Sequence, residues 1–190
     1  YAGIRLLIVR RTYQEMESNH IRILRPQLAQ VAEYKATTRT FTFLNGSTLE
    51  FGYCASDGDM DRYQGAEYDV IFLDECTQLR EQWMRKFAAC LRGVNDFPKR
   101  IYYTCNPGGP GHSYIKRLFI DRRFEPGENP DDYVFIPARV TDNKALLAAQ
   151  PDYLKQLEAL PRRLRQAWLE GRWDIFQGQV FSEFTDDPTH

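Results

Sequence analysis

The stretch DVIFLDECTQL, residues 69–79, places four apolar residues directly before two neighbouring carboxylates, Asp74 and Glu75. A short, continuous apolar run of this kind is typical of a strand that is buried on both faces of a sheet. In open α/β sheets, ligands bind at the carboxyl ends of such strands. The stretch therefore predicts a buried strand that delivers both carboxylates to the ligand-binding edge of a sheet.

Two interpretations of the carboxylate pair remain open at this point. In a nucleotide-hydrolysing site, Asp74 would hold Mg²⁺, directly or through a water, and Glu75 would orient and polarise the attacking water. In the alternative, Asp74 caps a helix that starts near Cys76, and Glu75 favours the first turn of that helix.

A second group of polar side chains follows the next expected strand, at about Arg100 to Thr104, in the stretch YYTCNPGGPGH, residues 102–112. Thr104 and Asn106 are small hydrogen-bonding residues at the end of that strand. In a nucleotide site they would contact the γ-phosphate or the lytic water. The alternative is a turn driven by glycine and proline, with Asn106 as an ordinary turn residue.

The amino-terminal part of the chain predicts a strand, a helix and a hairpin. The run Ile4–Arg11 is a buried strand, and Thr12–Val31 is rich in helix formers, with Pro26 ending or interrupting the helix. Asn45-Gly46 is a strong hairpin signal between two alternating segments. The two strands of this hairpin are Thr38–Leu44 and Thr48–Tyr53.

The rest of the chain alternates between loops, helices and one more strand. Residues 57–69 are acidic and contain glycines, which predicts a loop, and 133–140 predicts a strand. Helices are expected where apolar residues recur at helical spacing. These positions are Leu79, Trp83, Phe87 and Leu91 in one helix and Leu154, Leu157, Leu164 and Trp168 in another, within Pro151–Trp168; the tail residues Trp173, Phe176, Val180, Phe181 and Phe184 are expected to pack.

Strands that alternate with helices predict an α/β fold. We expect a mostly parallel sheet flanked by helices, an antiparallel β-hairpin extension and a small C-terminal helical segment. Residues 1–145 would form the core, and residues 146–190 would form a helical lid or linker subdomain.

Composition sets limits on the function. A chain of 190 residues with 43% hydrophobic residues is large enough for one substantial domain. The net charge of -1 gives no overall basic signature, so contact with nucleic acid would need local patches. The 4 cysteines form no Cys-x-x-Cys pair, which argues against structural zinc and fits reduced thiols. No apolar run approaches the roughly 20 residues that span a bilayer, so no membrane partner is expected.

Three longer stretches closely resemble a known family. They are RYQGAEYDVIFLDECTQL (residues 62–79), RIYYTCNPGGPGHSYIKRLFI (residues 100–120) and LRQAWLEGRWDIFQGQVFSEF (residues 164–184). Together they resemble the ATPase domain of the large terminase subunit of tailed bacteriophages and prophages, a P-loop NTPase of the ASCE type. The strand ending in Asp-Glu is shared by many P-loop ATPases, whereas the Asn-Pro-Gly-Gly-Pro-Gly-His run is much more specific.

The resemblance implies a role for each motif residue and implies ATP and Mg²⁺ as cofactors. Asp74 would be the magnesium-associated Walker B carboxylate, and Glu75 would be the catalytic glutamate. Thr104 and Asn106 match the coupling motif, which links the state of the γ-phosphate to movement of the domain.

The resemblance also gives roles to arginines. Arg62 matches a loop arginine that acts as a finger on the neighbouring subunit of a ring, and a planar, permanently charged guanidinium suits developing phosphoryl charge. The alternative for Arg62 is a solvated arginine paired with Asp59 or Asp61. Arg10 and Arg11 end the first strand and would contact nucleotide or form structural salt bridges.

At the level of the whole protein, the resemblance implies a DNA-packaging motor. ATP hydrolysis would drive double-stranded DNA into a procapsid. Expected partners are the DNA, the portal protein of the procapsid, the small terminase subunit and further copies in a homo-oligomeric ring, in the host bacterial cytoplasm, transiently docked on the portal. Two alternatives are another helicase-like P-loop ATPase and a catalytically dead prophage remnant that acts as an interaction module.

Two family features do not occur within these 190 residues. The Walker A pattern Gly-x-x-x-x-Gly-Lys-Ser/Thr is expected upstream, and without its phosphate cradle the chain alone should bind ATP poorly and hydrolyse it negligibly. By the resemblance, the metal-binding acids of the nuclease would follow Phe184. The late acidic residues Glu183, Asp186 and Asp187 are too sparse for a two-metal site, so no nuclease chemistry is expected of this chain. Basic pairs are candidates for DNA-backbone contact or simply form a solvated face. They are Lys99-Arg100, Lys116-Arg117 and Arg122-Arg123, together with Arg162, Arg163 and Arg165.

Overall fold

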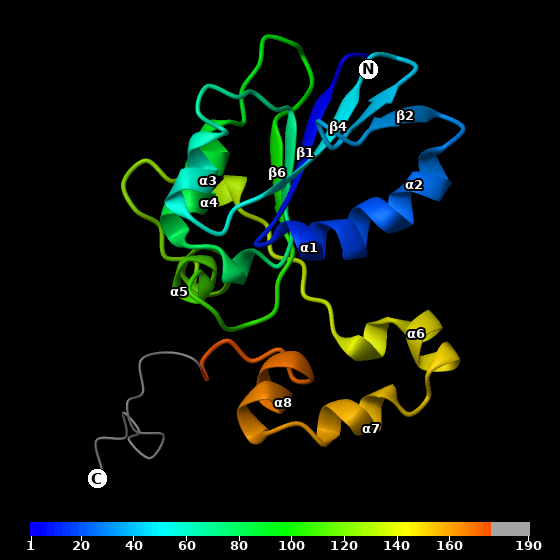
Figure 1. Cartoon of the computed structure of the whole chain (residues 1–190). Helices are drawn as coiled ribbons and strands as arrows, with labels where there is room; N and C mark the ends of the chain where they lie inside the picture. Colours follow the sequence, from blue (N-terminus) through cyan, green and yellow to red (C-terminus); the bar gives the residue numbers. More distant parts are fainter. Residues whose placement is uncertain (176–190) are drawn as a thin grey trace. The chain divides into compact units, whose positions relative to one another are not determined.

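The computed structural model describes residues 1–175 and divides the chain into two compact units (Figure 1). The first unit comprises Tyr1–Cys105, and the second begins at Asn106. The first unit is an α/β sheet, whereas the second is helical in its regular parts. Within residues 1–175, no helix combines the length and the apolarity needed to cross a membrane.

The first unit contains a six-stranded sheet with the order β2-β3-β4-β1-β5-β6. Strands β4, β1, β5 and β6 are parallel, and β2 and β3 add an antiparallel extension. This arrangement confirms the predicted fold class and the hairpin around Asn45-Gly46. The strand bounds are β1 Arg5–Arg10, β2 Ala32–Lys35, β3 Thr40–Phe43, β4 Thr48–Tyr53, β5 Val70–Leu73 and β6 Arg100–Tyr103.

Helices cover both faces of this sheet (Figure 1). On one face, α1 (Tyr13–Met16), η1 (Glu17–Ile21, a π-helical turn) and α2 (Arg22–Leu28) form one continuous helical run. Their buried side chains join those of β3 and β4 in a core of Met16, Ile21, Phe41, Leu49 and Phe51. Full burial of each large apolar side chain contributes about 1.5–3 kcal/mol.

The other face carries α3 (Asp57–Asp61) and α4 (Glu81–Ala89). Helix α4 buries Trp83, Met84 and Phe87, which confirms the predicted amphipathic helix. The Asp57 carboxylate accepts a hydrogen bond from Trp83 Nε1 at 2.6 Å, so α3 and α4 are tied together. A sheet buried on both sides explains why β1 and β5 are largely apolar.

Strand register brings the polar residues to one edge of the sheet. Val9 pairs with Leu73, and Leu73 pairs with Tyr103, so Arg10, Asp74 and Thr104 follow at one level. The backbone continues this level beyond the strands, because Asp74 N–H donates to the Val9 carbonyl at 2.9 Å. The carboxyl ends of three adjacent parallel strands therefore meet where ligands bind in this class of sheet.

Two predictions for the first unit are wrong. Pro26 does not end its helix, because α2 continues to Leu28. Pro26 has no N–H to donate to the Arg22 carbonyl, four residues earlier. Because both residues are exposed, water can bind that carbonyl instead. The loop predicted at 57–69 begins instead with α3, because Ser56 and Asp59 form a capping box. Strand β2 has no counterpart among the predicted elements.

The second unit contains short helical segments. They are α5 His112–Ile115, η3 Lys116–Ile120, η4 Pro130–Asp132, η5 Val140–Asp142, α6 Lys144–Ala149, α7 Tyr153–Glu158 and α8 Arg162–Trp168. The strand predicted at 133–140 is wrong, since no strand within residues 1–175 pairs with it and Ile136 is 81% exposed. A β-rich sequence needs a neighbour to complete its hydrogen-bond ladder.

Two details of the C-terminal helical prediction are corrected. The helix expected over 151–168 is two helices that break at Pro161, and Trp168 is 45% exposed while Leu157 and Ala167 are buried. In the predicted tail, Trp173 is buried and stacks on His112 with ring centroids 5.2 Å apart. Phe176, Val180, Phe181 and Phe184 lie outside the described residues.

Replacing Gly52 with alanine tests the packing between β4 and the loop after α3. A methyl group at Gly52 would collide with the hydroxyl of the buried Tyr63, which itself donates to the Tyr53 carbonyl at 3.2 Å. We expect Gly52→Ala to lower the free energy of unfolding by about 1–3 kcal/mol, measured in urea. Gly58→Ala is the matched control, because its nearest neighbour atom is 3.9 Å away. Equal stability of the two variants would contradict this packing.

Candidate active site

The Asp74 carboxylate is the centre of a polar cluster at the carboxyl edge of the sheet. Its Oδ2 lies 2.8 Å from Arg10 Nε and 2.8 Å from His20 Nε2. Its Oδ1 accepts a hydrogen bond from the Thr104 hydroxyl. The Arg10 contact is an ion pair rather than a hydrogen bond, because the Nε–H has no hydrogen-bond partner. Three elements thus converge on one carboxylate.

These contacts overturn the helix-cap interpretation of Asp74. The segment after the pair is a short 3₁₀ turn, η2 (Cys76–Gln78), whose N-cap is Glu75 and has no side-chain cap hydrogen bond. The Asp74 carboxylate is turned to Arg10, His20 and Thr104 instead. Cys76 is fully buried, as expected of a small core thiol, and burial raises its pKa well above the ordinary range.

Glu75 has an unusual backbone conformation. Its φ of 53° and ψ of 45° place it in the left-handed region, which disfavours a residue with a Cβ by about 1–2 kcal/mol. The conformation is held because Glu75 N–H donates to Thr104 Oγ1 at 3.3 Å and the next N–H, of Cys76, donates to the Thr104 carbonyl at 2.9 Å. Strain of this kind concentrates at functional sites.

The two neighbouring carboxyl groups have pKa values shifted in opposite directions. Burial alone would raise the pKa of Asp74, but hydrogen bonds from His20 and Thr104 and the charge of Arg10 outweigh burial and lower it. Burial and the adjacent Asp74 charge raise the pKa of Glu75. An ionised carboxylate thus lies beside a more basic one, which is the division between a metal ligand and a general base.

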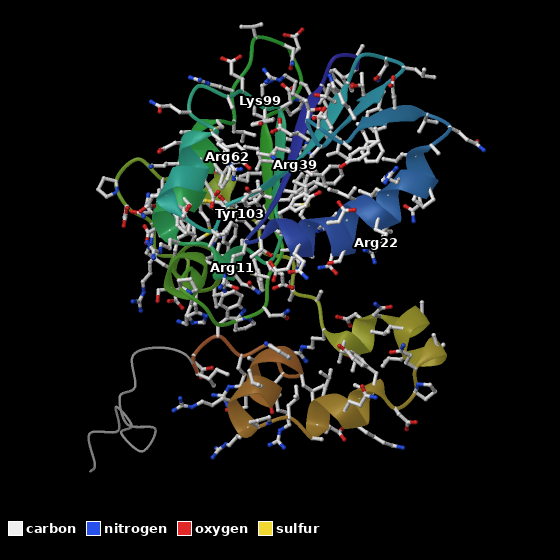
Figure 2. All side chains as sticks on the ribbon, in the orientation of Figure 1. Arg11, Arg22, Arg39, Arg62, Lys99 and Tyr103 are labelled. Carbon is white, nitrogen blue, oxygen red and sulfur yellow. The ribbon has the colours of Figure 1, made fainter. Side chains whose placement is uncertain are left out.

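The arginines of the first strand differ in their surroundings. The Arg10 side chain is only 14% exposed and its Nη2 lies 3.9 Å from Glu75 Oε1, so it serves both carboxylates. Arg11 follows at the same edge and is exposed (Figure 2). The structural salt-bridge interpretation therefore describes Arg10 in this structure, and a nucleotide contact by either arginine stays a prediction.

Arg62 follows the last residue of α3 and is paired within its own loop. It donates to Asp59 Oδ1 at 2.7 Å and to the Tyr53 carbonyl at 3.2 Å, and its guanidinium lies 4.1 Å from the centre of the Tyr53 ring. Tyr53 ends β4 and pairs in register with Arg10, which places Arg62 near the same sheet edge (Figure 2). The pairing with Asp59 is the one that the solvated-loop interpretation expects, and action on a neighbouring subunit stays a prediction.

Asn106 and His112 belong to the second unit. Nδ1 of His112 accepts the Gly108 N–H at 3.0 Å, and burial lowers the pKa of its imidazole. These contacts are typical of a structural histidine that holds the glycine-rich turn before α5. The role of Asn106 beside Thr104 stays a prediction.

His20 is the site residue that the sequence did not reveal. It lies 54 residues before its partner Asp74, in the helical run that covers one face of the sheet. In the sequence alone, His20 is only one of several residues at helical spacing in that run. No local motif connects two residues so far apart. Its π-helical turn is a feature found frequently at functional sites, but it becomes visible only in the structure.

The donor set fits magnesium held together with a nucleotide. Mg²⁺ in such sites keeps waters and takes one or two protein oxygens plus phosphate oxygens. The ionised Asp74 carboxylate and the Thr104 hydroxyl are such oxygens. Within residues 1–175 there is no cluster of three or more metal-ligating His, Cys, Asp or Glu side chains that could hold an ion alone. Oδ2 already has two close partners, whereas Oδ1 has only the Thr104 hydroxyl, so the ion would bind Oδ1 directly or reach Asp74 through a water.

A family model described as "Terminase large subunit, T4likevirus-type, N-terminal" matches residues 5–185. The chain belongs to this family. Among curated proteins, no sequence matches significantly.

Several solved structures share the terminase fold with this chain. The large terminase of a thermophilic bacteriophage, in a complex with ADP, has a TM-score of 0.71 and 17% identity, over 91% of this chain and 41% of that chain. A second crystal form of the same phage terminase has a TM-score of 0.72 and 18% identity, over 98% of this chain and 45% of that one. The large terminase ATPase domain of a Thermus phage has a TM-score of 0.57 and 14% identity, over 90% of this chain and 77% of that one.

The fold of this chain is therefore that of a P-loop NTPase. The present terminase chain spans less than half the length of the thermophilic-phage terminase that it matches in both crystal forms. In this chain, Asp74 and Glu75 directly follow β5, and Thr104 directly follows β6.

Neutralising each carboxyl group should change stability in opposite directions. The lowered pKa of Asp74 means that its ionised form stabilises the fold above the unfolded pKa and that this gain is lost as pH falls through the folded pKa. We expect Asp74→Asn to lower the free energy of unfolding at pH 7 by about 1–3 kcal/mol. The raised pKa of Glu75 means the reverse, so Glu75→Gln should stabilise by less than about 1 kcal/mol, and the gain should fade as pH falls through that pKa.

Urea unfolding at pH 7 measures both changes in stability, and unfolding at pH 4 tests whether the gain from Glu75→Gln fades. The exposed Glu33 offers Glu33→Gln as a control, which should change nothing. A stabilising Asp74→Asn or a destabilising Glu75→Gln at pH 7 would contradict the assignment of the two environments.

Proposed function

We propose that this chain is the ATP-hydrolysing module of a terminase large subunit that couples hydrolysis to translocation of double-stranded DNA. Membership of the terminase family supports the motor function. One observation carries the hydrolytic role: an ionised Asp74, held by Arg10, His20 and Thr104, lies beside the more basic Glu75 at the carboxyl edge of the sheet.

Each residue at this edge would perform one chemical task. Asp74 would hold Mg²⁺ beside the β- and γ-phosphates of ATP, where the ion neutralises developing charge. Glu75 would orient and polarise the attacking water. Thr104, which bonds to both Asp74 and the Glu75 backbone, would transmit the state of the γ-phosphate into β6, and Asn106 would continue that link into the second unit.

Arg62 would act on the nucleotide of a neighbouring subunit in a homo-oligomeric ring. In the isolated chain it is paired with Asp59 and stacked on Tyr53, so these contacts would be exchanged for phosphate in the assembled ring. While Arg62 is paired with Asp59 of its own subunit, it would be unable to act on phosphate before the ring assembles.

The wider proposal follows the family. Residues 1–145 would form part of the ATPase core, and 146–190 a helical lid or linker subdomain. Partners would be double-stranded DNA, the portal protein of the procapsid, the small terminase subunit and other copies of the large subunit, in the host bacterial cytoplasm at the portal. A helicase-like ATPase or an inactive prophage remnant that serves as an interaction module would be the alternative.

DNA-stimulated ATPase activity of the full-length subunit tests the hydrolytic role. We expect Glu75→Ala to lower turnover by about 10²–10⁴-fold while ATP binding is retained, because the water loses its base and the phosphate contacts remain. Glu81→Ala is the control, because Glu81 is an exposed carboxylate paired with Arg85. Normal turnover by Glu75→Ala would reduce the site to a structural cluster.

The present chain alone should be nearly inactive. It contains no glycine-rich phosphate loop with its lysine, and Asp74 and Glu75 alone would bind a nucleotide only weakly. We expect weak ATP binding and negligible hydrolysis by the purified 190-residue chain in a phosphate-release assay. Clear magnesium-dependent turnover would contradict this expectation.

Action of Arg62 on a neighbour can be tested by mixing subunits. We expect Arg62→Ala to lower DNA-stimulated turnover by about 10³-fold or more. Arg85→Ala is a closely matched control, since both side chains are about equally exposed, at 39% and 40%, and each forms an ion pair with a carboxylate of its own helix or loop.

Mixtures of the Arg62→Ala and Glu75→Ala proteins distinguish the two arrangements. Action in trans predicts that mixing restores part of the turnover, because some interfaces then combine an intact Arg62 with an intact Glu75. No restoration at any ratio would show that Arg62 serves its own subunit.

A further inference from the structure

We propose that His20 is a positioning residue that fixes the orientation of the Asp74 carboxylate toward the metal. This inference rests on the proposed function. His20 Nε2 and Asp74 Oδ2 are 2.8 Å apart, and each of the two side chains is only 23% exposed. The Thr104 hydroxyl occupies the other oxygen, Oδ1. The two oxygens are thus held from two different elements, and rotation of the carboxylate is restricted.

The π-helical turn explains how His20 reaches the sheet edge. Met16 and Ile21 are five residues apart and both are fully buried in the same core cluster. In a regular α-helix, side chains five residues apart point about 140° away from each other. The wider turn of η1, with Arg22 N–H donating to the Glu17 carbonyl, lets both residues face the core. The extra residue that this turn accommodates leaves His20 facing Asp74.

The helix on which His20 lies is anchored independently of the active site. Thr12 and Glu15 form a capping box at its start, and Met16 and Ile21 bury its inner side. Because the helix is fixed in this way, His20 is held in place and can in turn hold the Asp74 carboxylate in one orientation. Outer hydrogen-bond partners of metal ligands orient those ligands, and their loss typically lowers metal affinity or activity by about 10–100-fold.

The imidazole of His20 could instead weaken Mg²⁺ binding, which is the opposite of the effect proposed here. If His20 only competed with the ion for Oδ2, its removal would make Mg²⁺ bind more tightly. As a positioning residue, its removal leaves the carboxylate free to rotate, so more Mg²⁺ is needed. The direction of the change in Mg²⁺ requirement therefore separates the two.

The first experiment measures Mg²⁺ dependence of DNA-stimulated ATPase activity in the full-length subunit at a fixed pH and saturating ATP. We expect His20→Ala to raise the half-activating Mg²⁺ concentration about tenfold, with a smaller effect on turnover at saturating Mg²⁺. His20→Gln should restore most of the loss because its amide nitrogen reaches the place of Nε2. The shorter His20→Asn should not. Asn19→Ala, an exposed neighbour on the same turn, is the control.

The second experiment uses the present chain without metal and needs no activity. We expect His20→Ala to lower the melting temperature by about 2–4 °C in the wild-type background and to have no further effect in the Asp74→Ala background. Additive shifts would overturn the inference whether or not the subunit hydrolyses ATP. An unchanged or lower Mg²⁺ requirement in His20→Ala would also overturn it.

The two experiments separate failure of the inference from failure of the proposed function. If Glu75→Ala leaves turnover unchanged, the hydrolytic role is lost, and the melting experiment still decides whether His20 positions Asp74. If Glu75→Ala abolishes turnover but His20→Ala behaves like Asn19→Ala, the function stands and His20 has no part in it.

Discussion

The structure of the site depends on the confinement of the Asp74 carboxylate. Arg10, His20 and Thr104 reach it from the neighbouring strand β1, from the helical layer and from the end of strand β6. A half-buried carboxylate stays ionised only when such donors offset its desolvation. Strand register supplies two of the three contacts, because parallel strands β1, β5 and β6 end at one level. The sheet therefore determines the place of the site, and His20 from the helical layer helps to keep its carboxylate ionised.

The same arrangement that lowers the pKa of Asp74 raises the pKa of the neighbouring Glu75. Partial burial and the charge of Asp74 raise its pKa, and its left-handed backbone is held by bonds to Thr104. Both features lower the stability of the fold locally, and both suit a general base that must accept hydrogen bonding from water. The Thr104 hydroxyl donates to the Asp74 carboxylate and accepts a hydrogen bond from the Glu75 backbone N–H, so it connects both residues to the end of β6.

Sequence predicts what depends on local pattern and misses what depends on distant partners. The strand before Asp74 follows from its apolar run, and the hairpin from Asn45-Gly46, because each signal lies within a few residues. His20 escapes prediction because its partner lies 54 residues away and its turn is irregular. The strand expected at 133–140 fails for a related reason: strand propensity is realised only beside a partner, and none pairs with it among the residues described.

The most direct test of this account is the position of the metal in the full-length subunit. A crystal structure with a non-hydrolysable ATP analogue and Mn²⁺ in place of Mg²⁺ would locate the ion by its anomalous scattering. We expect the ion to lie between Asp74 and the phosphates, bound by that carboxylate directly or through one water. An ion bound to the phosphates and to other side chains, with Asp74 still held by Arg10 and His20, would contradict the account.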